Sequence, residues 1–290
     1  MILTSKTIQK EIAQELLTYY TSSEAEQLSF ILLEYFFSVQ KTVILKNINF
    51  HIDSSLKKKL FDAINRLKKQ EPIQYILGEA YFLGRKFMVN ENVLIPRPET
   101  EELVGLICQK HQQKKMAILD IGTGSACIAV SLALCMPKAM VSALDISEKA
   151  LEVAKKNAQN FEVSINFIKA DVLEWQADKQ SYDIVVSNPP YITESEKIFM
   201  EKNVLDFEPS LALFVKDDKP LIFYERIALL STQLLSENGF LYFEINEAFG
   251  EAVKVLLQTL HFENISLKND MYGKARFIEA QYKSSKFISK

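Results

Sequence analysis

The chain has 290 residues, of which 48% are hydrophobic and 24% are charged, and its formal net charge is −3. These values are typical of a folded globular protein, and they exclude a fibrous chain or one too polar to build a core. The small negative charge gives no support to tight, general binding of nucleic acid.

Cysteines, histidines and targeting signals set further limits. Cys108, Cys127 and Cys135 lack Cys-x-x-Cys spacing and the three histidines are scattered, so we expect no metal site. Unpaired cysteines are commonly buried, which predicts three free thiols in a reducing compartment. The first residues lack the features of a signal peptide, and no run approaches the ~18 apolar residues of a membrane span. We therefore expect a cytoplasmic protein that does not bind membranes.

Residues 1–77 have the pattern of a small helical domain. Apolar residues recur at helical spacing in three segments, which are residues 7–20, 22–37 and 54–70. Ser22 and Ser23 stand ahead of acidic residues, which favours a helix start in the second segment. Three short amphipathic helices predict a bundle.

The stretch 41–70 within this domain is rich in basic side chains. It carries eight lysines and arginines against two aspartates, a net charge of +6. Such a stretch is most often the solvated face of a helix. The other interpretation is a docking face for an acidic or RNA-associated partner.

Residues 78–98 break the helical pattern. Gly78 and Gly84 bound short aromatic segments, which predicts a β-hairpin or an extended connector. Pro96 and Pro98 then favour an extended bend, and the acidic residues from Glu99 onward favour the start of a helix.

From Met116 onward, short buried strands alternate with helices. The predicted strands are residues 116–121, 139–146, 165–171, 182–188, 240–246, 263–268 and 275–281. The predicted helices are residues 125–135, 147–161, 219–239 and 247–260, with Ser147 as the cap of the second and Gly239 closing the third. This alternation predicts an α/β fold with a parallel, doubly wound sheet.

A glycine turn follows the first of these strands. Gly122 and Gly124 permit a tight turn that lets a ligand approach the backbone in front of a helix N-terminus. The dinucleotide fingerprint wants a third glycine where this chain has Cys127, which counts against a nicotinamide cofactor. With Asp120 before the turn and the small Ala126 after it, the spacing fits S-adenosylmethionine better.

Aspartates follow the next two strands. Asp145 ends the second strand, where a carboxylate can accept hydrogen bonds from both ribose hydroxyls of a nucleoside. Asp171 ends the third strand and can accept from the exocyclic amine of adenine, while Val172 packs on the ring. The alternative is that these are ordinary turn and cap residues.

The sequence Asn188-Pro189-Pro190-Tyr191 follows the fourth strand. The side-chain oxygen of Asn188 and the carbonyl of Pro189 can each accept one hydrogen of a substrate –NH2 group. The nitrogen then turns toward a sulfonium methyl group, and Tyr191 supplies a flat wall. Such catalysis needs no nucleophile or metal, because it works by positioning and electrostatics. The alternative is a loop that merely stops a strand.

These motifs occur with several others that narrow the interpretation. They are DIGTGS (120–125), NPPY (188–191), EPIQYILGEAYFLG (71–84), VLIPRPETEELV (93–104), FEPSLALFV (207–215), FEIN (243–246) and DMYGKARF (270–277). Together they resemble the release factor glutamine N5-methyltransferases (PrmC/HemK family), which are class I S-adenosylmethionine-dependent enzymes. The resemblance spans residues 70–280, and the family also has a helical N-terminal domain.

The resemblance implies an architecture, a substrate and a cofactor. The fold would be a Rossmann-like class I sheet of seven mostly parallel strands with a small N-terminal helical bundle. Residues 1–77 would recognise the substrate, 78–98 would connect, and 99–290 would bind S-adenosyl-L-methionine and release S-adenosyl-L-homocysteine. The methyl group would go to the glutamine side chain in the Gly-Gly-Gln loop of bacterial-type peptide chain release factors.

The expected site residues fall into three groups. Cofactor binding is expected from Asp120, Gly122, Thr123, Gly124, Ser125, Ala126, Asp145, Asp171, Val172 and Asn188. Catalysis is expected from Asn188, Pro189, Pro190 and Tyr191. The same four residues, with Arg97 and Glu99, are expected to bind the substrate.

Three residues depart from the family pattern, and two rival functions stay open. The family commonly has glycine at the positions of Ala126 and Asn246 and an aromatic residue at that of Val172. One rival is a methyltransferase acting on an exocyclic amine of DNA adenine or rRNA guanine. The sequence pI near 5.8 and the absence of a basic domain count against it. The other rival is a binding module that has lost its chemistry.

Overall fold

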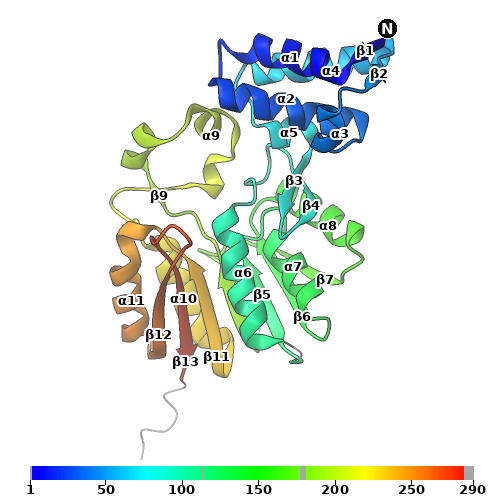
Figure 1. Ribbon diagram of the computed structural model, residues 1–290. Coiled ribbons are helices and arrows are strands. Elements are labelled where there is room, and N and C mark those ends of the chain that lie inside the picture. Colours follow the sequence, from blue (N-terminus) through cyan, green and yellow to red (C-terminus); the bar gives the residue numbers. More distant parts are fainter. Residues whose placement is uncertain (1, 113, 177–180, 284–290) are drawn as a thin grey trace, which may run out of the picture. The chain divides into compact units, whose positions relative to one another are not determined.

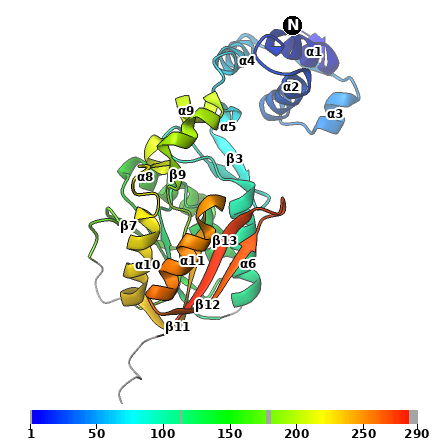
Figure 2. The same cartoon turned by 90° about the vertical axis from the view of Figure 1, so that its left-hand side faces the viewer.

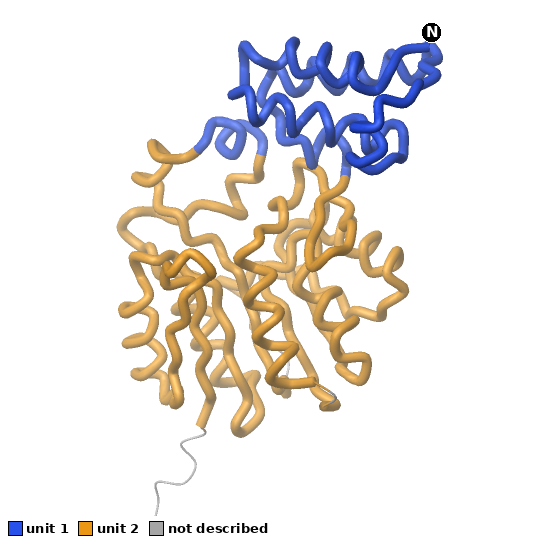
Figure 3. The backbone as a smooth tube through the Cα atoms, viewed as in Figure 1, with its two compact units in different colours: residues 1–78, 201–207 blue, residues 79–200, 208–290 orange. Residues whose placement is uncertain are grey.

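The computed structural model describes residues 2–112, 114–176 and 181–283. These residues form two compact units, residues 1–78 with 201–207 and residues 79–200 with 208–290 (Figure 3). No helix within the described ranges combines the length and the apolar character that crossing a membrane requires.

The first unit is helical. Its long helices are α1 (Ser5–Leu16), α2 (Ser22–Phe37) and α4 (Ser54–Leu67). Its short elements are β1 (Ile2–Thr4), α3 (Lys41–Leu45), β2 (Asn49–His51), α5 (Ile73–Leu77) and α9 (Lys202–Phe207). The predicted bundle of three amphipathic helices is confirmed, and α2 begins at a capping box between Thr21 and Glu24. The short elements were not predicted, because three to six residues carry too little periodicity.

The second unit opens with a β-hairpin and contains a seven-stranded sheet (Figure 1). The hairpin strands are β3 (Glu79–Phe82) and β4 (Arg85–Met88), which pair antiparallel; a hairpin was one of the two structures that the sequence allowed here. In spatial order the sheet strands are β12 (Phe262–Asn269), β13 (Ala275–Tyr282), β11 (Leu235–Glu244), β8 (Tyr182–Ser187), β5 (Ala117–Ile121), β6 (Met140–Asp145) and β7 (Ile165–Lys169). Only β13 runs against its neighbours.

Helices cover both faces of this sheet (Figure 2). They are α6 (Pro98–His111), α7 (Cys127–Cys135) and α8 (Glu148–Asn160) on one face, and α10 (Ile222–Leu234) and α11 (Gly250–Thr259) on the other. Alternate residues of β8 serve the two layers, since Ile184 and Val186 pack with the first group of helices and Val185 with the second. The predicted fold class, a Rossmann-like and mostly parallel sheet with a helical N-terminal part, is confirmed.

The strand order places a ligand site. From β5 the chain builds outward through β6 and β7, and it then returns to the other side of β5 with β8 and β11. In an open parallel sheet, the crevice at this reversal lies outside the carboxyl ends of the strands and is where ligands bind. The glycine turn after β5 and the Asn-Pro-Pro sequence after β8 both lie there.

Short elements fill the chain between β8 and α10. They are β9 (Ile192–Thr193), which pairs in parallel with β10 (Phe214–Val215), and the 3₁₀ turns η1 (Glu194–Phe199) and η2 (Ser210–Ala212). A further 3₁₀ turn, η3 (Glu247–Phe249), precedes α11.

The predicted helix over residues 219–239, closed by Gly239, is wrong at its C-terminal end. Helix α10 ends at Leu234, and Leu235 is already extended and pairs with Tyr182 of β8. Gly239 lies in an irregularity of β11, where an added Cβ would come within 2.9 Å of the Ser236 carbonyl oxygen. The glycine is therefore needed for a close backbone approach within a strand.

The prediction of three free thiols is also wrong. Cys108 of α6 and Cys135 of α7 form a disulfide, with their Cα atoms 6.2 Å apart. The two helices pack in the same layer, and a spacing of 27 residues along the chain does not reveal that proximity. Cys127 is free and buried, and burial raises its pKa to about 12.

Candidate active site

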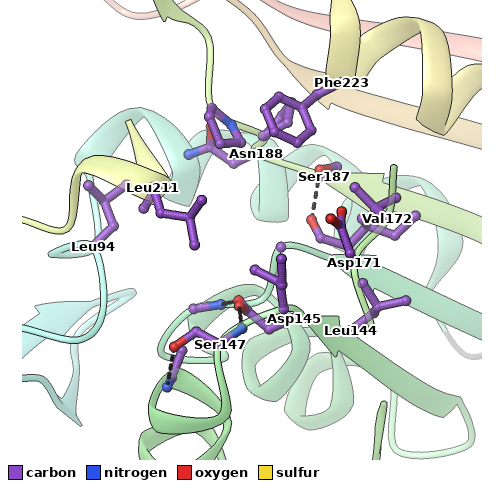
Figure 4. Close-up of a pocket in the computed structure, with 18 of the residues that line it drawn as sticks. Leu94, Leu144, Asp145, Ser147, Asp171, Val172, Ser187, Asn188, Leu211 and Phe223 are labelled. Carbon is purple, nitrogen blue, oxygen red and sulfur yellow. Dashed lines mark hydrogen bonds between the residues drawn. The ribbon is translucent and has the colours of Figure 1, made fainter. Parts of the chain in front are cut away.

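A cavity of about 210 Å³ opens at the carboxyl ends of β5, β6 and β8. Its wall includes eight of the expected residues, namely Gly122, Gly124, Asp145, Asp171, Val172, Asn188, Pro189 and Pro190. In Figure 4, Asp145 and Asn188 lie on opposite sides of this space. Leu94 and Leu211 close a third side, and Val172 lies opposite them.

The glycine turn forms the floor of the cavity beside β6. Gly122 and Gly124 have φ values of +75° and +54°, which glycine adopts without strain. Nothing lies within 4 Å of a Cβ built on Gly124, so its face is open toward a ligand. Ala126, which is the N-cap of α7, also has a left-handed conformation, with a φ of +62°. This conformation, together with helix packing, explains the glycine that the family commonly has there.

Asp145 joins the glycine turn to the end of β6. One carboxylate oxygen accepts the Gly124 N–H at 2.9 Å and the other accepts the Ser147 N–H at 2.9 Å. Burial raises the pKa of Asp145, and these backbone donors act in the opposite direction. Each oxygen can accept a second hydrogen bond, and Asp145 lines the cavity, which suits a diol.

The part of the cavity wall that follows β7 is apolar, apart from the carboxylate of Asp171. Asp171 lies two residues beyond β7, and one of its oxygens accepts the Leu173 N–H at 2.9 Å. Val172 is 9% exposed and lines the cavity with Leu144 and Phe223. Such a surface suits a flat apolar ring that carries a hydrogen-bond donor at its edge.

Four other expected cofactor residues, Asp120, Thr123, Ser125 and Ala126, lie in the glycine turn or next to it. All four are buried, and none is among the described residues that line the cavity. The Thr123 hydroxyl donates to Asp120 at 2.6 Å. Burial raises the pKa of Asp120 to about 7, against the effect of this bond and of the Ala129 N–H. These residues support the shape of the turn.

Sequence reasoning missed Asn157, which fixes the turn from α8. Its side-chain nitrogen donates to the carbonyls of Ser125 and Met88, at 2.9 Å each, and its oxygen accepts the Met88 N–H at 2.7 Å. The side chain is fully buried. An asparagine in an amphipathic helix gives no local sign of such a role.

Asn188 and the two prolines bring the end of β8 to the cavity. Ser187 holds this strand end by donating to the Ile121 carbonyl at 2.7 Å. The Asn188 side-chain nitrogen donates to the hydroxyl of Thr100 at 3.3 Å, and Thr100 donates to Glu244 at 2.6 Å. Tyr191 is not among the described residues that line the cavity. Its hydroxyl donates to the other oxygen of Glu244 at 3.0 Å.

Arg97 and Glu99 are not among the described residues that line the cavity. The Arg97 guanidinium pairs with Glu208 at 2.6 Å, and the second oxygen of Glu208 accepts the Ile95 N–H at 3.1 Å. This pair ties the segment that carries Leu94 to the segment that carries Pro209 and Leu211. Glu99 lies in the first turn of α6.

Asn246, one of the departures from the family pattern, holds the chain after Tyr191. Its side-chain nitrogen donates to the Tyr191 carbonyl at 3.2 Å and to Glu196 at 3.1 Å. Its side-chain oxygen accepts the Ala248 N–H at 2.9 Å. A glycine could make none of these contacts.

This sheet order, with a glycine turn and strand-end carboxylates around one cavity, is the Rossmann-like fold that class I methyltransferases have. The crystal structure of a methyltransferase from Pyrococcus furiosus shares the fold, with a TM-score of 0.52 and 13% identity over 80% of this chain and 100% of that one. Residues 101–205 match the family model described as methyltransferase small domain, and residues 8–78 match that of the PrmC N-terminal domain.

Curated relatives define the family. The release factor glutamine methyltransferase of Flavobacterium psychrophilum is 44% identical over 96% of this chain and 99% of its own length. That of Bacteroides thetaiotaomicron is 44% identical over 93% and 97%. The chain therefore belongs to the family of release factor glutamine methyltransferases, as the sequence motifs predicted.

Proposed function

We propose that this enzyme transfers a methyl group from S-adenosyl-L-methionine to the side-chain amide nitrogen of the glutamine in the Gly-Gly-Gln loop of peptide chain release factors. The observation that carries the proposal is Asn188, a neutral amide at the cavity wall whose nitrogen is already bonded to Thr100. Its side-chain oxygen is left to accept from a substrate –NH2 group. The relatives named above are release factor glutamine methyltransferases, which supports this substrate.

The residues that line the cavity support S-adenosyl-L-methionine as the cofactor. Asp145 would hold the ribose diol, Asp171 and Val172 would hold the adenine, and the open face of Gly124 would lie against the amino-acid part. When bound, S-adenosyl-L-methionine supplies an electrophilic methyl group on a sulfonium, and S-adenosyl-L-homocysteine is the product. Asp120, Thr123, Ser125 and Ala126 would act by keeping the turn in shape.

Asn188 and Pro189 would hold the glutamine. An amide nitrogen is a weak nucleophile because its lone pair is delocalised into the carbonyl group. The Asn188 side-chain oxygen and the Pro189 carbonyl would accept the two N–H groups, which orients the nitrogen and increases its electron density. Pro190 fixes the turn, and Tyr191 packs behind it. The methylated nitrogen is acidic enough to lose its proton to water.

We propose that residues 1–77 recognise the release factor and that 78–98 connect them to the catalytic part, residues 99–290. Lys57, Lys58 and Lys59 are exposed on α4, within the basic stretch. Replacing all three by glutamate should weaken binding of the release factor if this face docks it. The matched control replaces Lys138, Lys155 and Lys156, which are exposed in the second unit, in the same way. An unchanged affinity in the first variant would favour a solvated face.

A methyl-transfer assay tests the proposed function. The purified protein is given S-adenosylmethionine with a labelled methyl group and, in separate reactions, a release factor, its Gln→Ala loop variant, DNA or ribosomal RNA. We expect label only in the unaltered release factor. Label in nucleic acid alone would support the rival function and refute the proposal.

A further inference from the structure

We propose that Glu244 and Thr100 are positioning residues that set the orientation of the Asn188 amide. This inference rests on the proposed function, since it gives Asn188 the task of accepting a substrate N–H. The three side chains form one chain of hydrogen bonds, from the Asn188 nitrogen to the Thr100 hydroxyl at 3.3 Å and from that hydroxyl to Glu244 at 2.6 Å.

Burial makes this chain of bonds well defined. Glu244 is 1% exposed and Thr100 is 3% exposed, so water does not compete for either side chain. Thr100 lies in the first turn of α6, and Glu244 is the last residue of β11, next to β8. Both elements belong to the core of the second unit, which gives the hydroxyl and the carboxylate fixed places.

The direction of the bonds follows from the number of hydrogens. Burial raises the pKa of Glu244, and the hydrogen bonds from Thr100 and Tyr191 act in the opposite direction. In its ionised form the carboxylate only accepts, so the Thr100 hydroxyl donates its one hydrogen to Glu244. Thr100 can therefore only accept from Asn188, and the atom that faces it must be the side-chain nitrogen. A flipped amide would set two oxygen atoms against each other with no hydrogen between them. The Asn188 oxygen is thus directed away from Thr100, as required to accept from a substrate.

The same carboxylate also fixes the other end of the motif. Its second oxygen accepts the Tyr191 hydroxyl at 3.0 Å, so Glu244 holds the residues on both sides of the two prolines. Glu244 thereby sets the turn as a whole and, through Thr100, the direction of the Asn188 amide. It is a positioning residue, because it acts through Thr100, Asn188 and Tyr191.

Matched substitutions at Thr100 and Glu244 test the inference. Thr100→Val keeps the shape and removes the hydroxyl, whereas Thr100→Ser keeps the hydroxyl. Glu244→Gln keeps the shape but offers a donor on one side, which allows the bond direction at Thr100 to reverse. We expect kcat for release-factor methylation to fall about ten- to hundred-fold in Thr100→Val and Glu244→Gln, since misplaced catalytic groups have effects of this size.

Further readouts separate orientation from folding. The Kd for S-adenosylmethionine should change less than about twofold, and Thr100→Ser should recover kcat to within about threefold of wild type. The double variant Thr100→Val/Glu244→Gln should be no slower than the slower of the two single variants, because both substitutions break the same chain of hydrogen bonds. Ser231→Ala is the control for losing a buried hydroxyl, since that bond stays within α10.

Two outcomes would overturn the inference. One is a Thr100→Val enzyme with kcat within twofold of wild type; the other is an equal loss in Thr100→Val and Thr100→Ser. If either Thr100→Val or Glu244→Gln fails to fold by circular dichroism, the other variant decides. A wild-type enzyme that is inactive on release factor would instead refute the proposed function, so the two failures are distinguishable.

Discussion

Removing the carboxylate of Asp145 should weaken cofactor binding more than any other single change in the cavity wall. This side chain lies at the end of β6 and already accepts the N–H groups of Gly124 and Ser147. The proposed ribose hydroxyls would take the remaining lone pair of each oxygen. Asp145→Ala therefore removes two bonds to the ligand and also releases the glycine turn.

The size of the effect follows from these bonds. Hydrogen bonds to a charged group contribute about 1.5–3 kcal/mol each. Two such bonds together contribute about 3–6 kcal/mol, and water that fills the space left in Asp145→Ala replaces part of this, so we expect a loss of about 2–4 kcal/mol, or about thirty- to several-hundred-fold in Kd. Asp145→Asn should lose less, because one oxygen still accepts.

Isothermal titration calorimetry with S-adenosylmethionine measures this loss. The matched control is Asp183→Ala, near the opposite end of β8, where the carboxylate also accepts two bonds at 2.9 Å, from the Ala117 N–H and the Ser236 hydroxyl. A Kd for Asp145→Ala within threefold of wild type would refute the reasoning. So would an equal loss in the Asp183→Ala control.

Two further predictions concern stability. Burial, and then the charge of Lys110, lowers the pKa of His111 to about 4, so folding favours the neutral ring and its stabilising effect is lost as pH falls from about 6.5 to 4. When the pH is lowered from about 7 to 5, the wild type should lose about 1–2 kcal/mol more of its free energy of unfolding than His111→Gln does. Equal losses in the two proteins would contradict this. Glu208→Ala leaves Arg97 and the Ile95 N–H without their partner, so unfolding by urea should show a loss of about 2 kcal/mol. The cofactor Kd should also rise, whereas Glu208→Gln should retain most of both properties; an unchanged midpoint in Glu208→Ala would show that this pair does not tie the two segments.

The parts of the site that sequence could predict are those that strand ends bring together. Gly122 and Asn188 each follow a buried strand and Asp145 ends one, and parallel strands place their carboxyl ends at one edge. Their partners could not be predicted, because the pairing depends on packing between distant segments. Thr100 and Glu244 are 144 residues apart, and Ile95 and Glu208 are 113 apart. Both pairs lie inside motifs that sequence singled out without assigning their roles.

The errors in the fold have the same origin. Leu234 and Leu235 are both buried, yet one ends a helix and the other begins a strand, and their apolar character suits either element. Gly239 is typical of a helix end, but it serves an irregular strand. The Cys108–Cys135 bond depends on the packing of α6 beside α7, which no local pattern contains.

The measurement that tests the central proposal most directly is tandem mass spectrometry of a release factor after incubation with the enzyme and S-adenosylmethionine. We predict one added methyl group, with fragment ions that place it on the side chain of the Gly-Gly-Gln glutamine, and no added mass when Asn188→Ala replaces the wild-type enzyme. A methyl group on another residue, or on the glutamine with undiminished yield from Asn188→Ala, would contradict the account.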